Sequence, residues 1–438
     1  MRRFAGILGE RSFLVASAFV VQLAGAGLGF LLSIMLARLT GVAGVGLYFL
    51  AVTVVDISAT ISRLGLESTS MRFASIAHSR GELGDLASLY RKSMGVVFVT
   101  GAAVALLVWV VGSQLQIGGE RAPEFHGELP LLVFAIVPVA LLVIQAEFFK
   151  AVGRTATGTF SQALVPPLLL LAATIMLWLW GMGTVHAVFG SYVGAAIAAL
   201  AVAMATWHWR FPGLWRQRGS FDTGRLLRTS MPLLVVNSMT LILGWTDVLV
   251  LGIWRGAAEV GIYGIAMRLA VLTAFILSAV NVVVAPQFAA LHAEGKVVAL
   301  RRLAQQSAFW TLVAASPAIL ALLLVPELIL QIFGSQFTAG AAALRILALG
   351  QLVNVATGPV GTLLVMTGHE KLMRNIVAAS AALNLLCVLV LVPRFGATGA
   401  AAGTAFSLGV MKIVCWLMVR NTLGIDVLDY NALRKPAR

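Results

Sequence analysis

Charged side chains and cysteines are scarce in this sequence of 438 residues. Only 11% of the residues are Asp, Glu, Lys or Arg, whereas roughly a quarter of a soluble globular protein is charged. Hydrophobic residues make up 60% of the chain, and the mean hydropathy is +0.96. This balance excludes a soluble enzyme, a disordered chain and a fibrous protein. Cys387 and Cys415 both lie in apolar runs, which excludes a disulfide framework and a cysteine-based zinc site.

The sequence also lacks the common patterns for binding nucleotides and metals. It contains no glycine-rich phosphate loop with its lysine, so we do not expect ATP to be the energy source. None of the six histidines forms an i, i+4 ligand pair with a nearby acid, so we expect no metal site. We therefore expect no cofactor.

Long apolar runs, in contrast, are abundant. A membrane-spanning helix needs about 20 apolar residues, and its backbone must satisfy its own hydrogen bonds inside lipid. Twelve segments are predicted spans: 13–37, 44–65, 93–112, 129–149, 160–180, 184–209, 229–254, 258–284, 307–325, 342–366, 374–392 and 397–419. We expect an all-α integral membrane protein with about twelve transmembrane helices. The first run is too long for a signal peptide and is predicted to be retained.

The distribution of Lys and Arg predicts the orientation of these spans. With the N-terminus in the cytoplasm, 23 of the 31 cations fall in inside segments, and only Arg38, Arg121, Arg255 and Arg394 fall outside. Cytoplasmic segments of membrane proteins carry such an excess. We therefore expect both termini to be cytoplasmic. The net charge of +14 then faces anionic lipid rather than a nucleic acid, which would require one clustered basic face.

The two halves of the sequence resemble each other at an offset of 215 residues. The matches are GVAGVGLY (41–48) with GAAEVGIY (256–263), Phe73-Ala74 with Phe288-Ala289, Gly153 with Gly368, Gly181 with Gly396, and, after a one-residue gap, His78 and Gly81 with His292 and Gly295. We expect two six-helix lobes related by a pseudo-two-fold axis along the membrane normal, with a transport site between them. The predicted parts are an N-terminal lobe (1–210), a cytoplasmic linker (211–228), a C-terminal lobe (229–419) and a cytoplasmic tail (420–438). Segments 79–92 and 291–306 are expected to form short amphipathic helices on the inner surface.

Polar side chains inside the predicted spans are the candidate functional residues, because intramembrane charges are costly and usually functional. The second span carries a stripe at i, i+3, i+7 and i+10: Thr53, Asp56, Thr60 and Arg63. Gln22 and Asn237 lie in similar stripes of the first and seventh spans. We predict that Asp56 couples transport to an ion and that Arg63, Gln22 and Asn237 contact substrate. The alternative is that such residues only hold helices together.

Asp247 and Arg268 form a second candidate pair, in the seventh and eighth spans. Their midpoint falls in the short connection between the two spans, so we expect them at one depth in a helical hairpin. Two interpretations stay open: a salt bridge that cancels both charges, or a switch in which Asp247 binds H⁺ or Na⁺ while Arg268 contacts a phosphate. Arg345, in the tenth span, either lines an outer cleft as a substrate contact or extends to the interface. Glu147 and Lys150 are expected to form a local pair.

Three stretches resemble a known family. They are LRILALGQLVNVATGPVGTLLVMTGHEK (344–371), PRFGATGAAAGTAF (393–406) and GAAEVGIYGIAMRL (256–269), the last preceded by Trp245-Thr246-Asp247. They resemble the polysaccharide-biosynthesis flippase branch of the multidrug/oligosaccharidyl-lipid/polysaccharide exporter superfamily. The resemblance implies a V-shaped, two-lobed bundle in the bacterial inner membrane. It also implies transport of an undecaprenyl-diphosphate-linked O-antigen or capsule unit, with other polysaccharide-assembly membrane proteins as candidate partners. Lipid II flippases of this superfamily usually carry two extra spans, which are not found here and argue against a peptidoglycan precursor.

Two alternatives stand beside this interpretation. A drug or cation antiporter would have the same architecture and would differ only in substrate. A membrane glycan polymerase, ligase or acyltransferase would need a sizeable outer loop with catalytic residues, and the longest predicted outer loops, 113–128 and 326–341, have about 16 residues each. We therefore expect a transporter and not an enzyme.

Overall fold

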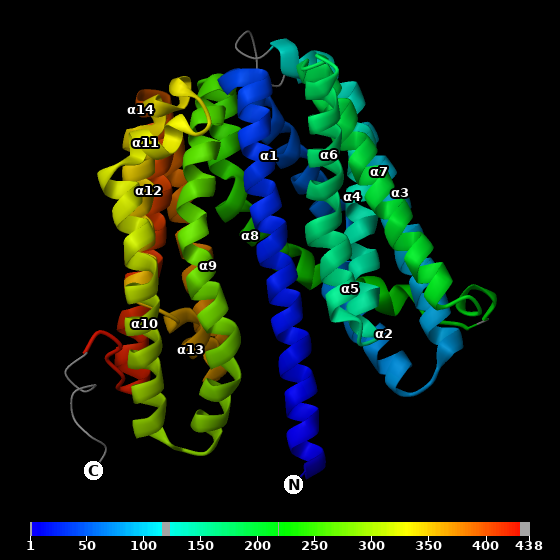
Figure 1. The fold of residues 1–438 in the computed structure, drawn as a ribbon. Coiled ribbons are helices and arrows are strands. Elements are labelled where there is room, and N and C mark those ends of the chain that lie inside the picture. Colours follow the sequence, from blue (N-terminus) through cyan, green and yellow to red (C-terminus); the bar gives the residue numbers. More distant parts are fainter. Residues whose placement is uncertain (1, 116–122, 218, 430–438) are drawn as a thin grey trace. The chain divides into compact units, whose positions relative to one another are not determined.

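The computed structural model describes residues 2–115, 123–217 and 219–429, and this part of the chain is built of helices without strands (Figure 1). The chain divides into two compact units, Met1–Leu241 (unit 1) and Ile242–Arg438 (unit 2). Unit 1 contains α1 (Arg2–Ser62), α2 (Leu66–Ser79), α3 (Leu83–Leu115), α4 (Pro123–Ala151), α5 (Thr155–Thr159), the π-helical turn η2 (Phe160–Leu164), α6 (Val165–Leu179), α7 (Val185–Arg210), the 3₁₀ turn η3 (Leu214–Arg216) and the first part of α8 (Thr223–Trp254). Unit 2 contains the rest of α8, α9 (Ala257–Ala293), α10 (Val297–Leu324), α11 (Pro326–Gln331), the 3₁₀ turn η4 (Ser335–Gly340), α12 (Ala341–Ala356), α13 (Val360–Met366) and α14 (Glu370–Leu423).

The long helices account for the predicted membrane spans. Nine helices in the described part of the chain are long and apolar enough to cross a membrane. Two of these are long enough to cross twice: Val20–Ser62 of α1 has 43 residues and α14 has 54. At 1.5 Å per residue they measure about 65 and 80 Å, more than twice the hydrocarbon thickness of about 30 Å. Both change direction at a glycine with non-helical backbone angles, Gly41 in α1 and Gly396 in α14. The remaining predicted span lies on α8, and the all-α class with twelve spans is confirmed.

The backbone confirms the internal repeat. Four glycine pairs that match in sequence also share positive φ angles: Gly41 (68°) with Gly256 (90°), Gly81 (73°) with Gly295 (67°), Gly153 (80°) with Gly368 (83°), and Gly181 (69°) with Gly396 (57°). Residues with a Cβ rarely adopt such angles. Each pair lies where one helical segment ends and the next begins, so the halves share their turns as well as their helices.

The segments 79–92 and 291–306 are not separate surface helices, and this prediction was wrong. In unit 1 a turn at Gly81 joins α2 to α3, and in unit 2 a turn at Gly295 joins α9 to α10. The amphipathic residues belong to the ends of long helices. At 37 residues α9 is about 55 Å long, so it exceeds the hydrocarbon thickness and its end is polar.

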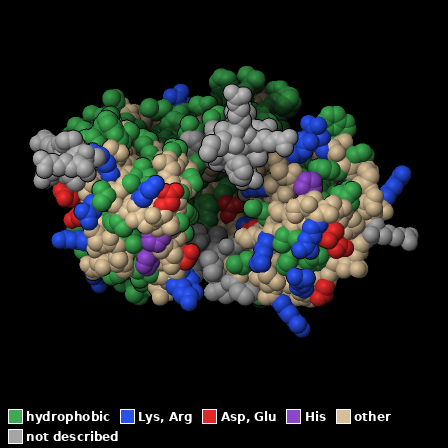
Figure 2. All heavy atoms as spheres, turned by 90° about the horizontal axis from the view of Figure 1, so that it is seen from below, with side chains coloured by type: hydrophobic (Ala, Val, Ile, Leu, Met, Phe, Trp, Pro, Cys, Tyr) green, Lys and Arg blue, Asp and Glu red, His purple; other side chains and the backbone are tan. Residues whose placement is uncertain are grey.

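Lys and Arg side chains gather at the end of each unit that contains these turns. In unit 2, Lys296, Arg301 and Arg302 lie on the α9–α10 turn and the start of α10. Figure 2 looks onto the molecule from this side and shows Lys and Arg side chains on its surface. That this side faces the cytoplasm stays a prediction from the charge distribution.

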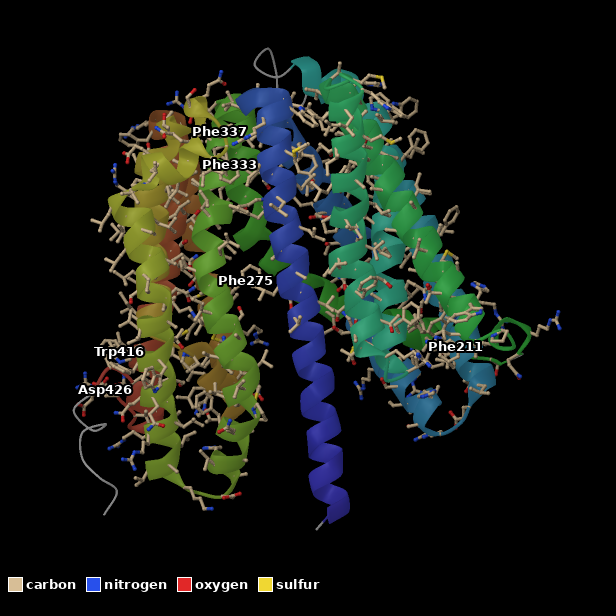
Figure 3. The ribbon with its side chains drawn as sticks, viewed as in Figure 1. Phe211, Phe275, Phe333, Phe337, Trp416 and Asp426 are labelled. Carbon is tan, nitrogen blue, oxygen red and sulfur yellow. The ribbon has the colours of Figure 1, made fainter. Side chains whose placement is uncertain are left out.

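Unit 1 has an aromatic core where α3, α4 and α7 meet, close to the α2–α3 turn. Trp207 of α7 stacks on Tyr90 of α3 with ring centroids 5.2 Å apart, and Phe148 and Phe149 of α4 meet its edges. Phe211, labelled in Figure 3, packs 4.6 Å from Trp207 and begins the segment toward η3. The Tyr90 hydroxyl donates a hydrogen bond of 2.7 Å to Gln145. Large rings that bury together in this way stabilise the junction of α3, α4 and α7.

The expected linker, residues 211–228, packs on unit 1. The Phe221 ring lies 5.2 Å from that of Phe73 in α2, and the Phe221 N–H donates to Ser88 Oγ of α3 at 3.2 Å. The division between the two units falls beyond the linker, inside α8. The physical reason is that α8 begins against the α1–α2 turn: a Cβ on Gly65 would lie 2.4 Å from the Ser230 carbonyl oxygen.

Unit 2 buries the segment that follows α14. The Asp426 side chain accepts a hydrogen bond from Trp416 Nε1 at 3.1 Å (Figure 3). The Asp426 backbone carbonyl accepts one from the Gln305 side chain of α10 at 2.9 Å. Ile425 and Val427 on either side are buried. This segment therefore ties α14 to α10.

The kink in α14 is held by a carboxylate from α9. Glu259 Oε2 accepts a hydrogen bond of 2.7 Å from the N–H of Ala397, which starts the second half of α14. A negative charge at a helix N-terminus satisfies a free N–H and is favoured by the helix dipole. Gly396 leaves room for this contact, because a Cβ there would lie 2.6 Å from the same oxygen.

We predict that Gly396→Ala destabilises unit 2. The left-handed backbone costs a residue with a side chain about 1–2 kcal/mol, and the added methyl would displace Glu259. The matched control is Gly409→Ala in the same helix, where a Cβ meets nothing within 4 Å. Thermal unfolding of the purified protein, followed with a thiol-reactive dye that detects buried Cys415, should show a lower midpoint for Gly396→Ala only. Equal midpoints for both variants would contradict the prediction.

Candidate functional site

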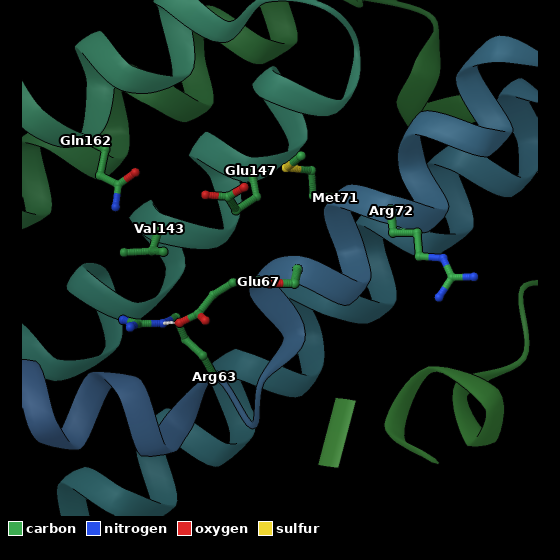
Figure 4. Close-up of a pocket in the computed structure, with 8 residues that line it drawn as sticks. Arg63, Glu67, Met71, Arg72, Val143, Glu147 and Gln162 are labelled. Carbon is green, nitrogen blue, oxygen red and sulfur yellow. Dashed lines mark hydrogen bonds and ion pairs between the residues drawn. The ribbon is translucent and has the colours of Figure 1, made fainter. Parts of the chain in front are cut away.

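A polar pocket of about 440 Å³ lies in unit 1 where α1 ends (Figure 4). It is lined by residues of the α1–α2 turn and α2, of α4, and of η2: Arg63, Glu67, Ser68, Met71, Arg72, Val143, Glu147 and Gln162. Four of these eight side chains are charged, in a chain of which only 11% is charged. Such a concentration of charge among apolar helices marks a candidate site.

The α1–α2 turn positions Arg63. α1 ends at Ser62, and Gly65 adopts φ 73°, which interrupts the helix before α2 begins at Leu66. The Arg63 guanidinium then donates from Nη2 to Thr60 Oγ1 at 2.7 Å and forms an ion pair through Nε with Glu67. The two charged side chains are only 11% and 17% exposed. Arg63 and Thr60 of the predicted stripe are thus brought together, whereas Thr53 is buried and bonds within its own helix.

A second ion pair lies on α4. Lys150 Nζ is 2.7 Å from Glu147 Oε1, which confirms the predicted local pair, and it also donates to Gln162 Oε1 at 3.3 Å. Gln162 belongs to η2, so Lys150 connects α4 to the π-helical turn. Lys150 is therefore a third cation beside the pocket, in addition to Arg63 and Arg72, which line it.

The charges of the pocket suit an anionic ligand that takes the place of the Glu67 carboxylate beside Arg63. Three cations, Arg63, Arg72 and Lys150, face two carboxylates, Glu67 and Glu147. Arg72 is exposed, and Figure 4 shows its guanidinium directed away from the Arg63–Glu67 pair. A phosphate that replaced Glu67 would meet the forked donors of Arg63, which match its geometry.

A buried carboxylate forms a separate cluster in unit 2. Asp247 of α8 is 2% exposed, and its Oδ2 accepts hydrogen bonds from the Tyr263 hydroxyl of α9 and, at 2.8 Å, from Thr404 Oγ1 of α14. The two hydroxyls are 3.1 Å apart. Asp247 Oδ1 has no hydrogen-bond partner among the described residues. Three helices therefore converge on one carboxylate that has a free oxygen.

Of the two interpretations of Asp247 and Arg268, the salt bridge is not supported, because among the described residues the partners of Asp247 are the two hydroxyls. The hairpin turns at Gly256, so the residue at the depth of Asp247 is Tyr263. Arg268 lies five residues further along α9, a rise of about 7.5 Å. A midpoint count gives depth only to within a few residues and does not give the direction of a side chain.

Arg345, Gln22 and Asp56 are not among the residues that line the pocket or that bond to Asp247. Arg345 of α12 forms an exposed ion pair with Glu327 at 2.9 Å. Gln22 of α1 is exposed, and Asp56 is partly exposed and within electrostatic range of Arg63. The Asn237 side chain lies outside the described residues. Whether these residues take part in transport stays a prediction.

Glu67, Tyr263 and Thr404 were not predicted as site residues. Glu67 lies four residues after Arg63, a spacing that favours pairing on a helix, but it falls beyond the end of the predicted span. Tyr263 and Thr404 lie in the repeat motif and in a family-like stretch, yet only the packing of three helices makes them partners of one carboxylate. Among the described residues, no group of three or more His, Cys, Asp or Glu is arranged to hold a metal ion.

Comparisons with solved structures support the fold. The lipid II flippase MurJ in an inward closed conformation superposes with a TM-score of 0.71 at 12% sequence identity, over 96% of this chain and 90% of that chain. An inward-facing multidrug resistance MATE family transporter of the MOP superfamily gives 0.68 at 14% identity, over 97% and 96%. At these identities the similarity shows a common fold.

Comparisons of sequence identify the family. A curated relative, described as a probable low-salt glycan biosynthesis flippase, Agl15, from Haloferax volcanii, is 25% identical over 90% of this chain and 80% of its own length. The MatE family model matches residues 232–390. The model of the family described as "Polysaccharide biosynthesis protein" matches residues 15–292, more than half of the chain. The chain, a multi-pass membrane protein, therefore belongs to the polysaccharide biosynthesis protein family.

Proposed function

We propose that this protein is a flippase that moves a lipid-linked oligosaccharide from the cytoplasmic to the outer leaflet of a bacterial inner membrane. The observation that carries the proposal is the family match over residues 15–292. The relative Agl15, described as a glycan biosynthesis flippase, supports the same substrate class. The chain is accordingly a transporter and not an enzyme.

The proposed lipid carrier is undecaprenyl diphosphate, linked to an O-antigen or capsule unit. A sugar head group cannot cross hydrocarbon cheaply, because each unsatisfied polar group costs several kcal/mol. A polar pocket inside an apolar helical unit lowers this cost. The diphosphate would bind to Arg63 in place of Glu67, which supplies a charge-assisted contact without leaving an unpaired cation when substrate is absent.

Transport is proposed to proceed by alternating access driven by an H⁺ or Na⁺ gradient. Asp247 is the proposed coupling residue, because it is buried and retains one oxygen without a partner. A proton or sodium ion on this carboxylate would neutralise a charge that is costly inside the unit. The hydroxyl oxygens of Tyr263 and Thr404 are of the kind that Na⁺ takes as ligands, whereas a proton would bind the carboxylate itself.

A drug or cation antiporter is the second candidate function. The specific observation in its favour is the MatE family match at residues 232–390. Both functions use one architecture, so substrate tests separate them.

Deletion of the gene distinguishes the two candidates. We expect a deletion strain to lose its surface polysaccharide, detected by electrophoresis of extracted glycan, and to regain it when the chain is expressed from a plasmid. Drug sensitivity should match that of the parent strain. Normal surface glycan together with increased drug sensitivity would favour the antiporter.

Charge-neutral variants of the pocket test the role of Arg63. In the double variant Arg63→Gln/Glu67→Gln neither partner is left as an unpaired charge, and we expect at least a tenfold lower rate of glycan translocation. Glu67→Gln alone keeps the cation and should retain most activity. The assay is translocation of a fluorescent undecaprenyl-diphosphate oligosaccharide in proteoliposomes, with exposed Arg80→Ala as the control. If the translocation rate fell equally in Glu67→Gln and in the double variant, the ion pair would have only a structural role.

Asp247→Asn tests ion coupling. Asparagine keeps an acceptor for Tyr263 and Thr404 but cannot take up a proton, so we expect slower transport that no longer responds to an imposed H⁺ or Na⁺ gradient. The control is Glu370→Gln, an exposed acid at the start of α14. A gradient response equal to that of the unmodified protein would refute coupling at Asp247 while leaving the flippase proposal standing.

A further inference from the structure

In unit 1 the linker covers the corner where α2 meets α3. Gly219 approaches Gly84 so closely that a Cβ on Gly219 would lie 2.1 Å from the Gly84 carbonyl oxygen. Two residues further along the linker, both backbone groups of Phe221 form hydrogen bonds to α3. The N–H donates to Ser88 Oγ at 3.2 Å, and the carbonyl accepts from Lys92 Nζ at 2.5 Å. Ser88 is buried beneath this segment. The corner of unit 1 is therefore a binding surface for an extended chain.

The repeat places the same corner in unit 2. After the Gly81–Gly295 match the offset is 214 residues, so Gly84, Ser88 and Lys92 correspond to Val298, Arg302 and Gln306. Here the surface is open: a hollow of about 480 Å³ is lined by Gly295, Lys296, Val297, Val298, Ala299 and Arg302. Val298 is 83% exposed and Val297 is 50% exposed. Val298 and Arg302, the counterparts of Gly84 and Ser88, thus line an open hollow in unit 2.

The chemistry of the unit 2 corner suits an acidic segment. Arg302 and Gln306 replace Ser88 and Lys92 on one face of α10, four residues apart, and both can donate to backbone carbonyls or a carboxylate. Lys296 and Arg301 add positive charge beside the acid Glu294, and Arg301 also donates to the Gly424 carbonyl at 2.9 Å. Lys296 forms an ion pair with Glu294 at 2.6 Å, and this hydrogen bond raises the pKa of the Lys296 ammonium.

The position of the corner favours a protein over lipid as the occupant. It lies on the α9–α10 turn, at the lower end of unit 2 in Figure 1 and on the side shown in Figure 2. Since α9 is about 55 Å long and the hydrocarbon core is about 30 Å thick, its end projects beyond the core. The chain's own residues 430–438 carry three cations and no acid, so like charge opposes their binding there.

We propose that the corner at residues 295–306 is a docking site for an extended segment of a partner protein in which an aromatic residue precedes a carboxylate. In the chain's own linker Phe221 precedes Asp222, whose carboxylate caps α8 by accepting from the Gly224 and Arg225 N–H groups. The carboxylate of the docked segment is therefore inferred from the positive charge of Lys296 and Arg302. The partner's backbone would accept hydrogen bonds from Arg302 and Gln306, and its carboxylate would meet Lys296. Its aromatic ring would pack on Val297 and Val298, because the unit 2 counterpart of Phe73, Phe288, is fully buried.

A peptide with the linker sequence tests the docking site. The probe is a fluorescent, capped peptide of residues 219–224 (GSFDTG), titrated against the full chain in zwitterionic nanodiscs and followed by fluorescence anisotropy. We expect saturable binding, at least tenfold weaker for Val298→Glu, which adds a charge to an exposed position. Asn421→Glu, which adds the same charge at an exposed position near the end of α14, should leave binding unchanged. A peptide with Asn in place of Asp222 should bind more weakly.

Three outcomes would overturn the proposal. The first is an absence of saturable binding, or equal binding to the unmodified chain and to Val298→Glu. The second is loss of peptide binding when the nanodiscs contain anionic phosphatidylglycerol, which would assign the corner to lipid. The third is tighter binding after truncation at Asp429, which would assign it to the chain's own tail.

Discussion

The constraint on which this structure depends is that a backbone inside hydrocarbon must satisfy its own hydrogen bonds. The described residues meet it with long helices, two of which would span a membrane twice. Direction can then change only at positions where the backbone leaves the helix. Many of those positions are glycines with positive φ, and four pairs of them recur in the two halves of the chain. The repeat is therefore a repeat of turns, and each turn determines which side chains meet at the ends of the helices.

The same constraint governs the few charges within and beside these helices. A charge out of water is tolerated when it is paired or hydrogen-bonded. Arg63 has Glu67 and Lys150 has Glu147, and both pairs adjoin one pocket in unit 1. Asp247 in unit 2 has two hydroxyls in place of a cation and keeps one oxygen unbonded. These are two kinds of compensation: an ion pair that an anionic ligand can replace, and a carboxylate that a proton or cation can neutralise.

The two units share a backbone pattern but have diverged in what covers their ends. In unit 1 the linker lies over the α2–α3 corner, with Phe221 held by Ser88 and Lys92. In unit 2 the corresponding corner presents exposed valines and cations. In unit 2 the segment that follows α14 bonds to Arg301 and Gln305 of α10, and the hollow beside Val297 and Val298 stays open.

The sequence by itself determined the helical class, the twelve spans, the repeat and the rare intramembrane charges. These properties depend on local hydrophobicity and on offsets along the chain, which need no knowledge of packing. The local pair of Glu147 and Lys150 was predictable for the same reason, because its members stand at i and i+3 on one helix. Tertiary structure decided the partners of Asp247, the pairing of Arg63 across the α1–α2 turn and the joining of predicted surface helices to longer ones. Each of these depends on where a turn falls and which way a side chain points. A shift of five residues moves a group by about 7.5 Å along a helix and around to another face.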